Sequence, residues 1–131
     1  MEQKINLLLI EDNPADALFA GIQLKKAFGD AHHLQTTDYF LKATQICETK
    51  KFDAIILDLS LPDSRGLDTL KKFVSTYNTP IIVYTGMSDK LVIKEAKNSG
   101  ATDFLIKGET TVELLKQSIL KSIEMYNTSN K

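Results

Sequence analysis

The chain has 131 residues, of which 43% are hydrophobic and 25% are charged, and its net charge is -1. This length suits one domain with its own core, and the near-neutral charge gives no reason to expect nucleic acid or an anionic membrane surface as a partner. Cys47 is the single cysteine, which excludes a disulfide framework and a cysteine-based metal site. The apolar run after Lys4 is too short for a signal peptide or a membrane span, so we expect a cytoplasmic protein.

Short apolar runs alternate along the chain with longer segments whose apolar residues recur at helical spacing. The runs predict strands at residues 5–10, 32–37, 54–57, 80–85 and 102–107. The longer segments predict helices at residues 14–28, 39–50, 67–77, 89–99 and 110–125. Residues 127–131 are polar and are expected to form a frayed tail.

The first predicted helix has a clear start signal and an apolar stripe. Asn13 can cap its amino end, and Pro14 suits the first helical position because it lacks a backbone N–H group. Leu18, Ile22 and Phe28, with Ala15, recur at helical spacing, and Gly29 can end the helix.

Turn and cap residues mark the other boundaries. Ser88 can cap the fourth helix, and Gly100 suits a left-handed position after that helix ends. Thr110 with Glu113 matches a capping box at the start of the last helix. Residues 63–65 are interpreted as a solvated turn.

Strict alternation of strands and helices predicts an α/β fold, because right-handed crossovers then produce a parallel sheet with helices on both faces. No internal repeat, low-complexity tract or linker interrupts the pattern. We therefore expect a single domain over residues 1–131, built as a three-layer sandwich around a five-stranded sheet, with no output domain within these residues.

Polar residues stand where four of the predicted strands end. Glu11 and Asp12 follow the first strand, Asp58 follows the third, and Thr85 and Lys107 end the fourth and fifth. The carboxyl ends of parallel strands lie along one edge of a sheet, so these side chains are expected to converge. Three carboxylates gathered there need a cation, and Mg²⁺ prefers such oxygen ligands.

This combination favours attack by a carboxylate on phosphorus, which gives an acyl phosphate. Phosphoryl transfer depends mainly on positioning and on neutralising charge, and a metal ion, a lysine and a hydroxyl group supply both. No general base is required, because an aspartate is already ionised at neutral pH.

Over residues 6–126 the sequence resembles a two-component response regulator receiver domain. The matching segments, specific when taken together in this order, are Leu8–Asn13, Ile56–Pro62 with Gly66, Ile82–Gly86 and Gly100–Lys107. The resemblance implies a flavodoxin-like (βα)5 fold with the strand order 2-1-3-4-5. It also implies that a partner histidine kinase, a histidine phosphotransfer protein or a small acyl phosphate donates the phosphoryl group. The downstream effector is not written in the sequence.

The resemblance assigns a role to each residue of the predicted site. Asp58 would be the phosphoacceptor and, with Asp12, a direct ligand of Mg²⁺. Glu11 would bind the ion through water and Ser60 through its backbone carbonyl. Thr85 would close onto the phosphoryl group, and Lys107 would pair with one of its oxygens. Phe104 would be an aromatic switch that changes the surface formed by the fourth helix, the last strand and the last helix.

One departure from the family pattern concerns the loop after the lysine. The family usually has a proline there on a cis peptide bond, whereas Gly108 follows Lys107 in this chain. A cis bond before a residue other than proline costs about 3 kcal/mol, so we predict a trans bond. We also expect Tyr84 to point away from the site if Thr85 points into it, because side chains alternate along a strand.

Three alternative functions use related folds or chemistry. A phosphohydrolase of the haloacid-dehalogenase type would want a second acid two residues after its nucleophile, where this chain has Ser60. A flavodoxin-like electron carrier would place flavin phosphate beside Glu11 and Asp12, which would repel it. A pseudo-receiver, an unphosphorylated interaction module of the same fold, is disfavoured by the complete set of acids, threonine and lysine.

Overall fold

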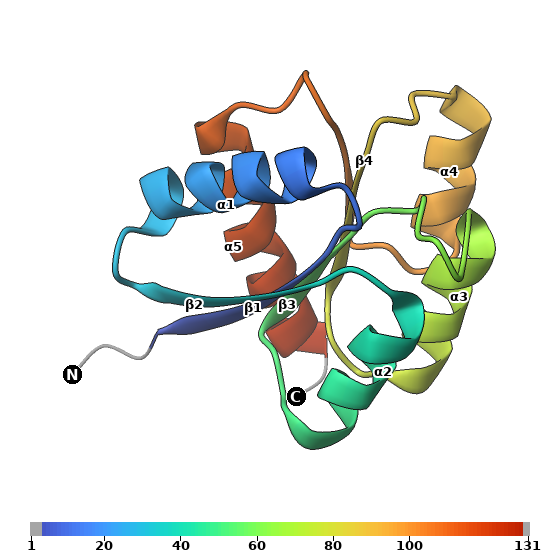
Figure 1. Cartoon of the computed structure of the whole chain (residues 1–131), viewed down its shortest axis with the longest axis horizontal. Coiled ribbons are helices and arrows are strands. Elements are labelled where there is room, and N and C mark those ends of the chain that lie inside the picture. Colours follow the sequence, from blue (N-terminus) through green and yellow to red (C-terminus); the bar gives the residue numbers. More distant parts are fainter. Residues whose placement is uncertain (1–3, 130–131) are drawn as a thin grey trace.

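The computed structural model describes residues 4–129, and in this part of the chain five strands alternate with five helices (Figure 1). The strands are β1 (Ile5–Ile10), β2 (His32–Thr37), β3 (Ala54–Leu57), β4 (Ile81–Thr85) and β5 (Asp103–Ile106). The helices are α1 (Pro14–Phe28), α2 (Phe40–Thr49), α3 (Leu67–Thr76), α4 (Lys90–Asn98) and α5 (Val112–Ser129).

The strands form one parallel sheet in the order β2-β1-β3-β4-β5, which confirms the predicted fold and strand order. Helices α1 and α5 cover one face, and α2, α3 and α4 cover the other (Figure 1). The central strand β3 is buried along its whole length, whereas β2 is half-exposed, as expected for a polar edge strand. The carboxyl ends of all the strands therefore lie along the same edge.

Alternate residues of each central strand pack on opposite faces of the sheet. In β1, Leu7 and Leu9 belong to the core beneath α1 and α5, and Leu8 and Ile10 belong to the core beneath α2, α3 and α4. Tyr84 in β4 follows this rule: it lies in the core beneath α1, where its hydroxyl donates a 2.7 Å hydrogen bond to the Gln23 side chain. The predicted orientation of Tyr84 is confirmed.

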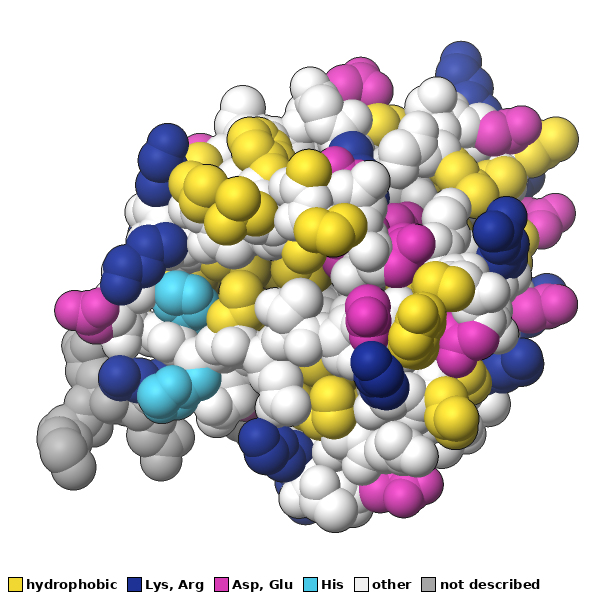
Figure 2. Space-filling model, viewed as in Figure 1, with side chains coloured by type: hydrophobic (Ala, Val, Ile, Leu, Met, Phe, Trp, Pro, Cys, Tyr) yellow, Lys and Arg dark blue, Asp and Glu magenta, His cyan; other side chains and the backbone are white. Residues whose placement is uncertain are grey.

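The predicted helix α1 is confirmed, but two of the apolar residues that recur at helical spacing along it do not face the core. Leu18 and Ile22 are 67% and 44% exposed, and hydrophobic side chains gather over α1 in Figure 2. The helix instead buries Ala20, Gln23 and Leu24, while Phe28 packs on the core. The spacing of the larger apolar residues therefore did not indicate which side of α1 faces the sheet. The hydrogen bond between Gln23 and Tyr84 joins residues 61 positions apart, so no local sequence pattern predicts it.

Two helix caps differ from the predicted ones by one residue. Asp89, not Ser88, caps α4, because its Oδ1 accepts the Leu91 N–H at 2.8 Å. At α5 the cap is Thr111, whose Oγ1 accepts the Leu114 N–H at 3.1 Å. The last helix also continues to Ser129, past the predicted end at residue 125, so the part of the expected tail that lies outside the described residues is 130–131.

The turn after β3 is not simply solvated. The carboxylate of Asp63 accepts hydrogen bonds from the backbone N–H groups of Phe40, at 2.7 Å, and Leu41, at 3.0 Å, and so caps α2 from a distant loop. Burial alone would raise the pKa of Asp63, but these N–H donors outweigh it and hold that pKa below its ordinary value. Ser64 is buried and shares a 2.6 Å hydrogen bond with Thr69.

Candidate functional site

The polar residues at the strand ends meet at the carboxyl edge of the sheet. The ligand oxygens of Glu11, Asp12 and Asp58 all lie within 4.8 Å of one another. Lys107 reaches the same point from the end of β5: its Nζ is 3.0 Å from Asp58 Oδ2 and is also paired with Glu11 Oε1. Parallel topology thus brings together side chains that are far apart in sequence. Their roles in chemistry stay predictions.

Burial and neighbouring charge shift the ionisation of this group. Glu11 and Asp58 are each 5% exposed. Burial, together with the adjacent Asp58, raises the pKa of Glu11 to about 7 against the opposing effect of Lys107. Burial would raise the pKa of Asp58 as well, but hydrogen bonds with Glu11 and Lys107 outweigh it and lower that pKa. When no metal ion is bound and the pH is somewhat below about 7, the pair therefore carries a proton on Glu11, while Asp58 stays ionised.

The ammonium group of Lys107 is held in its charged form. Burial disfavours that form, yet hydrogen bonds to Glu11, Asp16 and Asp58 outweigh burial and raise the pKa of Lys107. Its side chain is 22% exposed, so water reaches it from one side. Lys107 therefore stays protonated across the physiological range and offers a permanent positive charge beside Asp58.

Three carboxylates around one point form a donor set that fits Mg²⁺, a hard cation that binds one or two carboxylates and retains several waters. Asp12 is exposed, whereas Glu11 and Asp58 are buried, so a metal ion can approach from the solvent side. The only positive charge paired with Glu11 and Asp58 in residues 4–129 is the single one of Lys107. A divalent ion would offset the negative charge of the carboxylates that Lys107 alone does not neutralise.

The other predicted site residues lie around this group. Ser60 follows β3 and its N–H donates to Asp58 Oδ1 at 3.3 Å. Thr85, the last residue of β4, is 1% exposed, and its hydroxyl contributes to the lowered pKa of Asp58. Phe104 in β5 is 8% exposed and packs in the core beneath α4. Its ring is therefore already directed inward, and its role as a switch stays a prediction.

The loop after Lys107 has the geometry expected from its sequence. No cis peptide bond occurs among the described residues, so the predicted trans bond before Gly108 is confirmed. Gly108 adopts a φ of +85°, a conformation that favours glycine. A cavity of about 230 Å³ opens beside Lys107, with Asp16, Phe19 and Gly108 among its walls.

Sequence reasoning missed one residue of the site. Asp16 lies in the first turn of α1, and its Oδ2 is 2.9 Å from the Nζ of Lys107. Asp16 ends no strand: it comes four positions after Asp12, on the following helix, and so has no strand-end signal in the sequence. The start signal at Asn13 and Pro14 placed it in the first helical turn and therefore at the same edge of the sheet.

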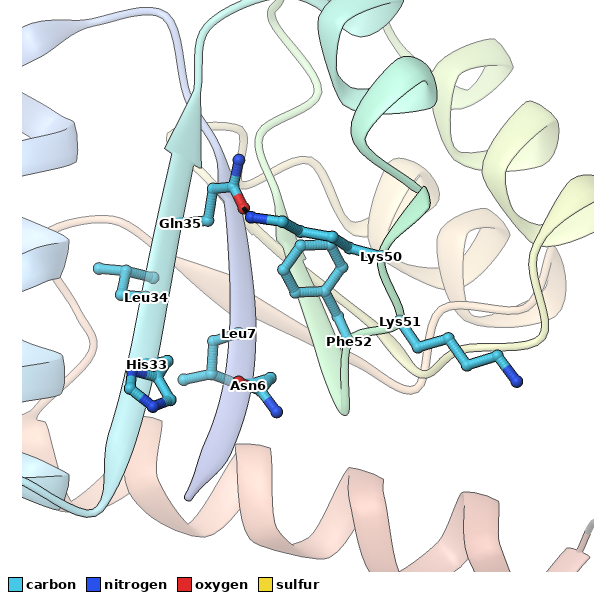
Figure 3. Close-up of a pocket in the computed structure, with 8 residues that line it drawn as sticks. All are labelled: Asn6, Leu7, His33, Leu34, Gln35, Lys50, Lys51 and Phe52. Carbon is cyan, nitrogen blue, oxygen red and sulfur yellow. Dashed lines mark hydrogen bonds between the residues drawn. The ribbon is translucent and has the colours of Figure 1, made fainter. Parts of the chain in front are cut away.

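A separate hollow lies at the other end of the sheet. This cavity of about 430 Å³ is formed by the first residues of β1, by β2 and by the segment before β3, and Figure 3 shows Lys50 extended across it toward Gln35. The Nζ of Lys50 is 2.9 Å from Gln35 Oε1. No carboxylate lines this cavity, so it contributes nothing to the acidic site.

The sequence was also compared with known proteins. The family model for the response regulator receiver domain matches residues 7–119. The chain belongs to this family. The match includes every residue of the predicted site, from Glu11 to Lys107. The comparisons give no support to a haloacid-dehalogenase-type hydrolase or a flavodoxin.

Relatives of this receiver domain include longer regulators. The cell cycle transcriptional regulator CtrA of Caulobacter vibrioides is 33% identical over 104 residues, which are 79% of this chain and 44% of the relative. The transcriptional regulatory protein KdpE of Staphylococcus aureus is 32% identical over 114 residues, 87% of this chain and 47% of that protein. The chain thus spans less than half the length of these relatives.

Solved structures agree with the fold. The signal receiver domain of a putative Luxo repressor protein from Vibrio parahaemolyticus superposes with a TM-score of 0.84 at 26% identity, covering 97% of this chain and 95% of that one. A CheY-like receiver domain protein from Methanospirillum hungatei gives a TM-score of 0.80 at 16% identity, covering 97% and 99%. In the described part of the receiver domain, no helix combines the length and hydrophobicity needed to cross a bilayer.

Proposed function

We propose that this receiver domain accepts a phosphoryl group on Asp58 in a reaction that depends on Mg²⁺. The observation that carries the proposal is a 5% exposed carboxylate just after β3, with the Lys107 ammonium 3.0 Å away and two further carboxylates within 4.8 Å. A buried anion surrounded in this way is a nucleophile beside a place where the charge of a phosphoryl group can be neutralised.

The transfer forms one bond and breaks one. A carboxylate oxygen of Asp58 attacks the phosphorus atom of the donor, and the bond from phosphorus to the donor's nitrogen or oxygen breaks, with its electron pair leaving on the donor. Lys107 neutralises one phosphoryl oxygen and the Thr85 hydroxyl donates a hydrogen bond to another. Asp12 and Asp58 would hold Mg²⁺ directly, Glu11 through water and Ser60 through its carbonyl; the ion supplies positive charge to the phosphoryl oxygens.

The partners follow from this chemistry. A sensor histidine kinase or a histidine phosphotransfer protein is the proposed donor, and a downstream effector of unknown identity reads the result. We propose a cytoplasmic signalling module over residues 1–131 that contacts neither nucleic acid nor membrane and catalyses only its own phosphorylation and dephosphorylation. CtrA and KdpE are named as transcriptional regulators, but this chain matches less than half of each.

Phosphorylation is proposed to alter the surface formed by α4, β5 and α5. Thr85 ends the strand next to β5 in the sheet, and Phe104 packs against the same core as α4, so a shift of Thr85 toward a phosphoryl group has a route to that surface. Amide hydrogen exchange of phosphorylated and unphosphorylated protein should differ in these elements; identical exchange there would rule the switch out.

Incubation with a small acyl phosphate and Mg²⁺ tests the proposed phosphorylation. Intact mass should rise by one phosphoryl group in the wild type and stay unchanged in Asp58→Asn, and the added group should be lost in alkali, as an acyl phosphate is. Asp53→Asn is the matched control, because Asp53 precedes the same strand at its opposite end and should leave the reaction intact. A wild type that no donor modifies would instead indicate an unphosphorylated pseudo-receiver.

Binding of Mg²⁺ should depend on pH. Glu11 has a pKa of about 7, so below that value a metal ion must displace its proton, and the affinity falls. We expect roughly tenfold weaker binding at about pH 6 than at about pH 8, the ratio for one displaced proton. Titration calorimetry measures both the affinity and the proton released.

Two variants decide whether Glu11 is responsible for this pH dependence. Glu11→Gln should bind Mg²⁺ with an affinity that hardly changes between those pH values. Glu109→Gln removes an exposed glutamate that is no part of the carboxylate group and should keep the wild-type dependence. An equal dependence in wild type and Glu11→Gln would show that another group releases the proton.

A further inference from the structure

Asp16 is the third acidic partner of Lys107, and its backbone is fixed independently of that lysine. Its Oδ2 lies 2.9 Å from the Lys107 Nζ, and its side chain is 44% exposed. The side chain of Asn13 accepts the Asp16 backbone N–H at 3.0 Å, which fixes the first turn of α1. The carboxylate therefore projects from the end of a capped helix and is already oriented toward the ammonium group.

Asp16 differs from the other two partners of Lys107 because it lies outside the group of carboxylates that can hold a metal ion. That group consists of Glu11, Asp12 and Asp58. A divalent cation bound there would compete with the ammonium for oxygens of Glu11 and Asp58, since all these oxygens attract positive charge. Asp16 is the partner that Lys107 keeps when this competition occurs.

We propose that Asp16 is a positioning residue that holds Lys107 beside Asp58 while Mg²⁺ occupies the acidic site. The ammonium has three N–H groups, so it can keep one hydrogen bond to Asp16 and direct another at an incoming phosphoryl oxygen. This inference rests on the proposed phosphorylation of Asp58. It concerns what orients the Lys107 ammonium toward the phosphoryl donor, which the roles proposed for the strand-end residues do not explain.

The proposal predicts a change in maximal rate. Asp16→Asn removes the one charged partner of Lys107 that lies outside the carboxylate group. When Mg²⁺ is bound, the ammonium should then be directed at the phosphoryl group in a smaller fraction of molecules. We expect the maximal rate of Asp58 phosphorylation to fall about two- to fivefold, the loss expected for one partly exposed ion pair. Removing an anion also weakens repulsion of the anionic donor, so the donor concentration at half-maximal rate should not rise.

The experiment measures phosphorylation by acetyl phosphate at saturating Mg²⁺, over a range of donor concentrations, in a double-mutant cycle. Wild type, Asp16→Asn, Lys107→Gln and the double variant are compared. If Asp16 acts through Lys107, the effect of Asp16→Asn on the maximal rate disappears in the Lys107→Gln background. Asp68→Asn is the matched control: Asp68 is the acid in the first turn of α3 and is not a partner of Lys107.

Each other outcome overturns the inference. An Asp16→Asn protein as fast as wild type, or one slowed equally with and without Lys107, would show that Asp16 does not act through the lysine. If Asp16→Asn lowered the donor concentration at half-maximal rate and left the maximal rate unchanged, Asp16 would act only by repelling the anionic donor. A wild type that takes up no phosphoryl group would overturn the proposed function, and this inference with it.

Discussion

Lys107→Ala is expected to lower the free energy of unfolding of the metal-free protein by about 2–4 kcal/mol at about pH 8, because it removes one partner of a buried charge pair. Glu11 and Asp58 are each 5% exposed, and their ion pairs in the described residues are both with Lys107. Without the ammonium, two buried carboxylates face each other. The loss should be smaller at about pH 5, where Glu11, with a pKa of about 7, carries a proton.

Urea unfolding of wild type and variant at both pH values measures this effect. Excess Mg²⁺ should restore much of the lost stability, since the ion provides the missing positive charge to the same oxygens. Lys25→Ala is the matched control: its ion pair with Asp30 is exposed, and its removal should change stability little. A loss of the same size for both variants would show that the buried carboxylates do not need Lys107.

Gly100→Ala should destabilise the protein by about 3 kcal/mol or more, the sum of backbone strain and overpacking. Gly100 has a φ of +113°, which disfavours any residue with a Cβ atom. That Cβ would also lie 2.6 Å from Val74 Cγ1 on α3, closer than two carbon atoms that are not bonded to each other normally approach. The close contact lies between the end of α4 and Val74 on α3, so relief requires that side chain or one of the two helices to shift. Thermal or urea unfolding gives the size of the loss.

Gly108→Ala distinguishes the two causes. Gly108 also has a positive φ, +85°, but an added Cβ would meet no atom within 4 Å, so strain alone should cost about 1–2 kcal/mol. In a Val74→Ala background the cost of Gly100→Ala should fall toward that value, because the clashing methyl groups are gone. An unchanged cost in that background would place the whole penalty in the backbone.

The sequence contained most of the fold and the set of strand-end residues. Parallel strands buried on both faces produce continuous apolar runs, and each run ends where a charged or hydroxyl residue follows, as at Asp58 and Lys107. The alternation of strands and helices then requires that these residues share one edge of the sheet. The convergence of these residues follows from the topology of the sheet, so the sequence alone predicts it.

Apart from the two helix caps, which were displaced by one residue, the differences arose where a side chain finds its partner far along the chain. Leu18 and Ile22 recur at helical spacing, but the observed rotation of α1 exposes them and buries Gln23, which pairs with Tyr84. Asp16 meets a lysine 91 residues away. Local periodicity carries no information about such pairs, because hydrophobic spacing reports the existence of a helix better than its rotation.

The capping of α2 by Asp63 limits which lengths the loop after the proposed phosphoacceptor can have. Inserting or deleting one residue between Asp58 and Asp63 would carry the carboxylate away from the N–H groups of Phe40 and Leu41, and the first turn of α2 would lose two hydrogen bonds at once. An insertion would also move Leu59 and Leu61, which are fully buried, out of the core. A variant library with insertions in this loop should therefore recover few folded proteins. Engineering of the site must keep this spacing and vary side chains only.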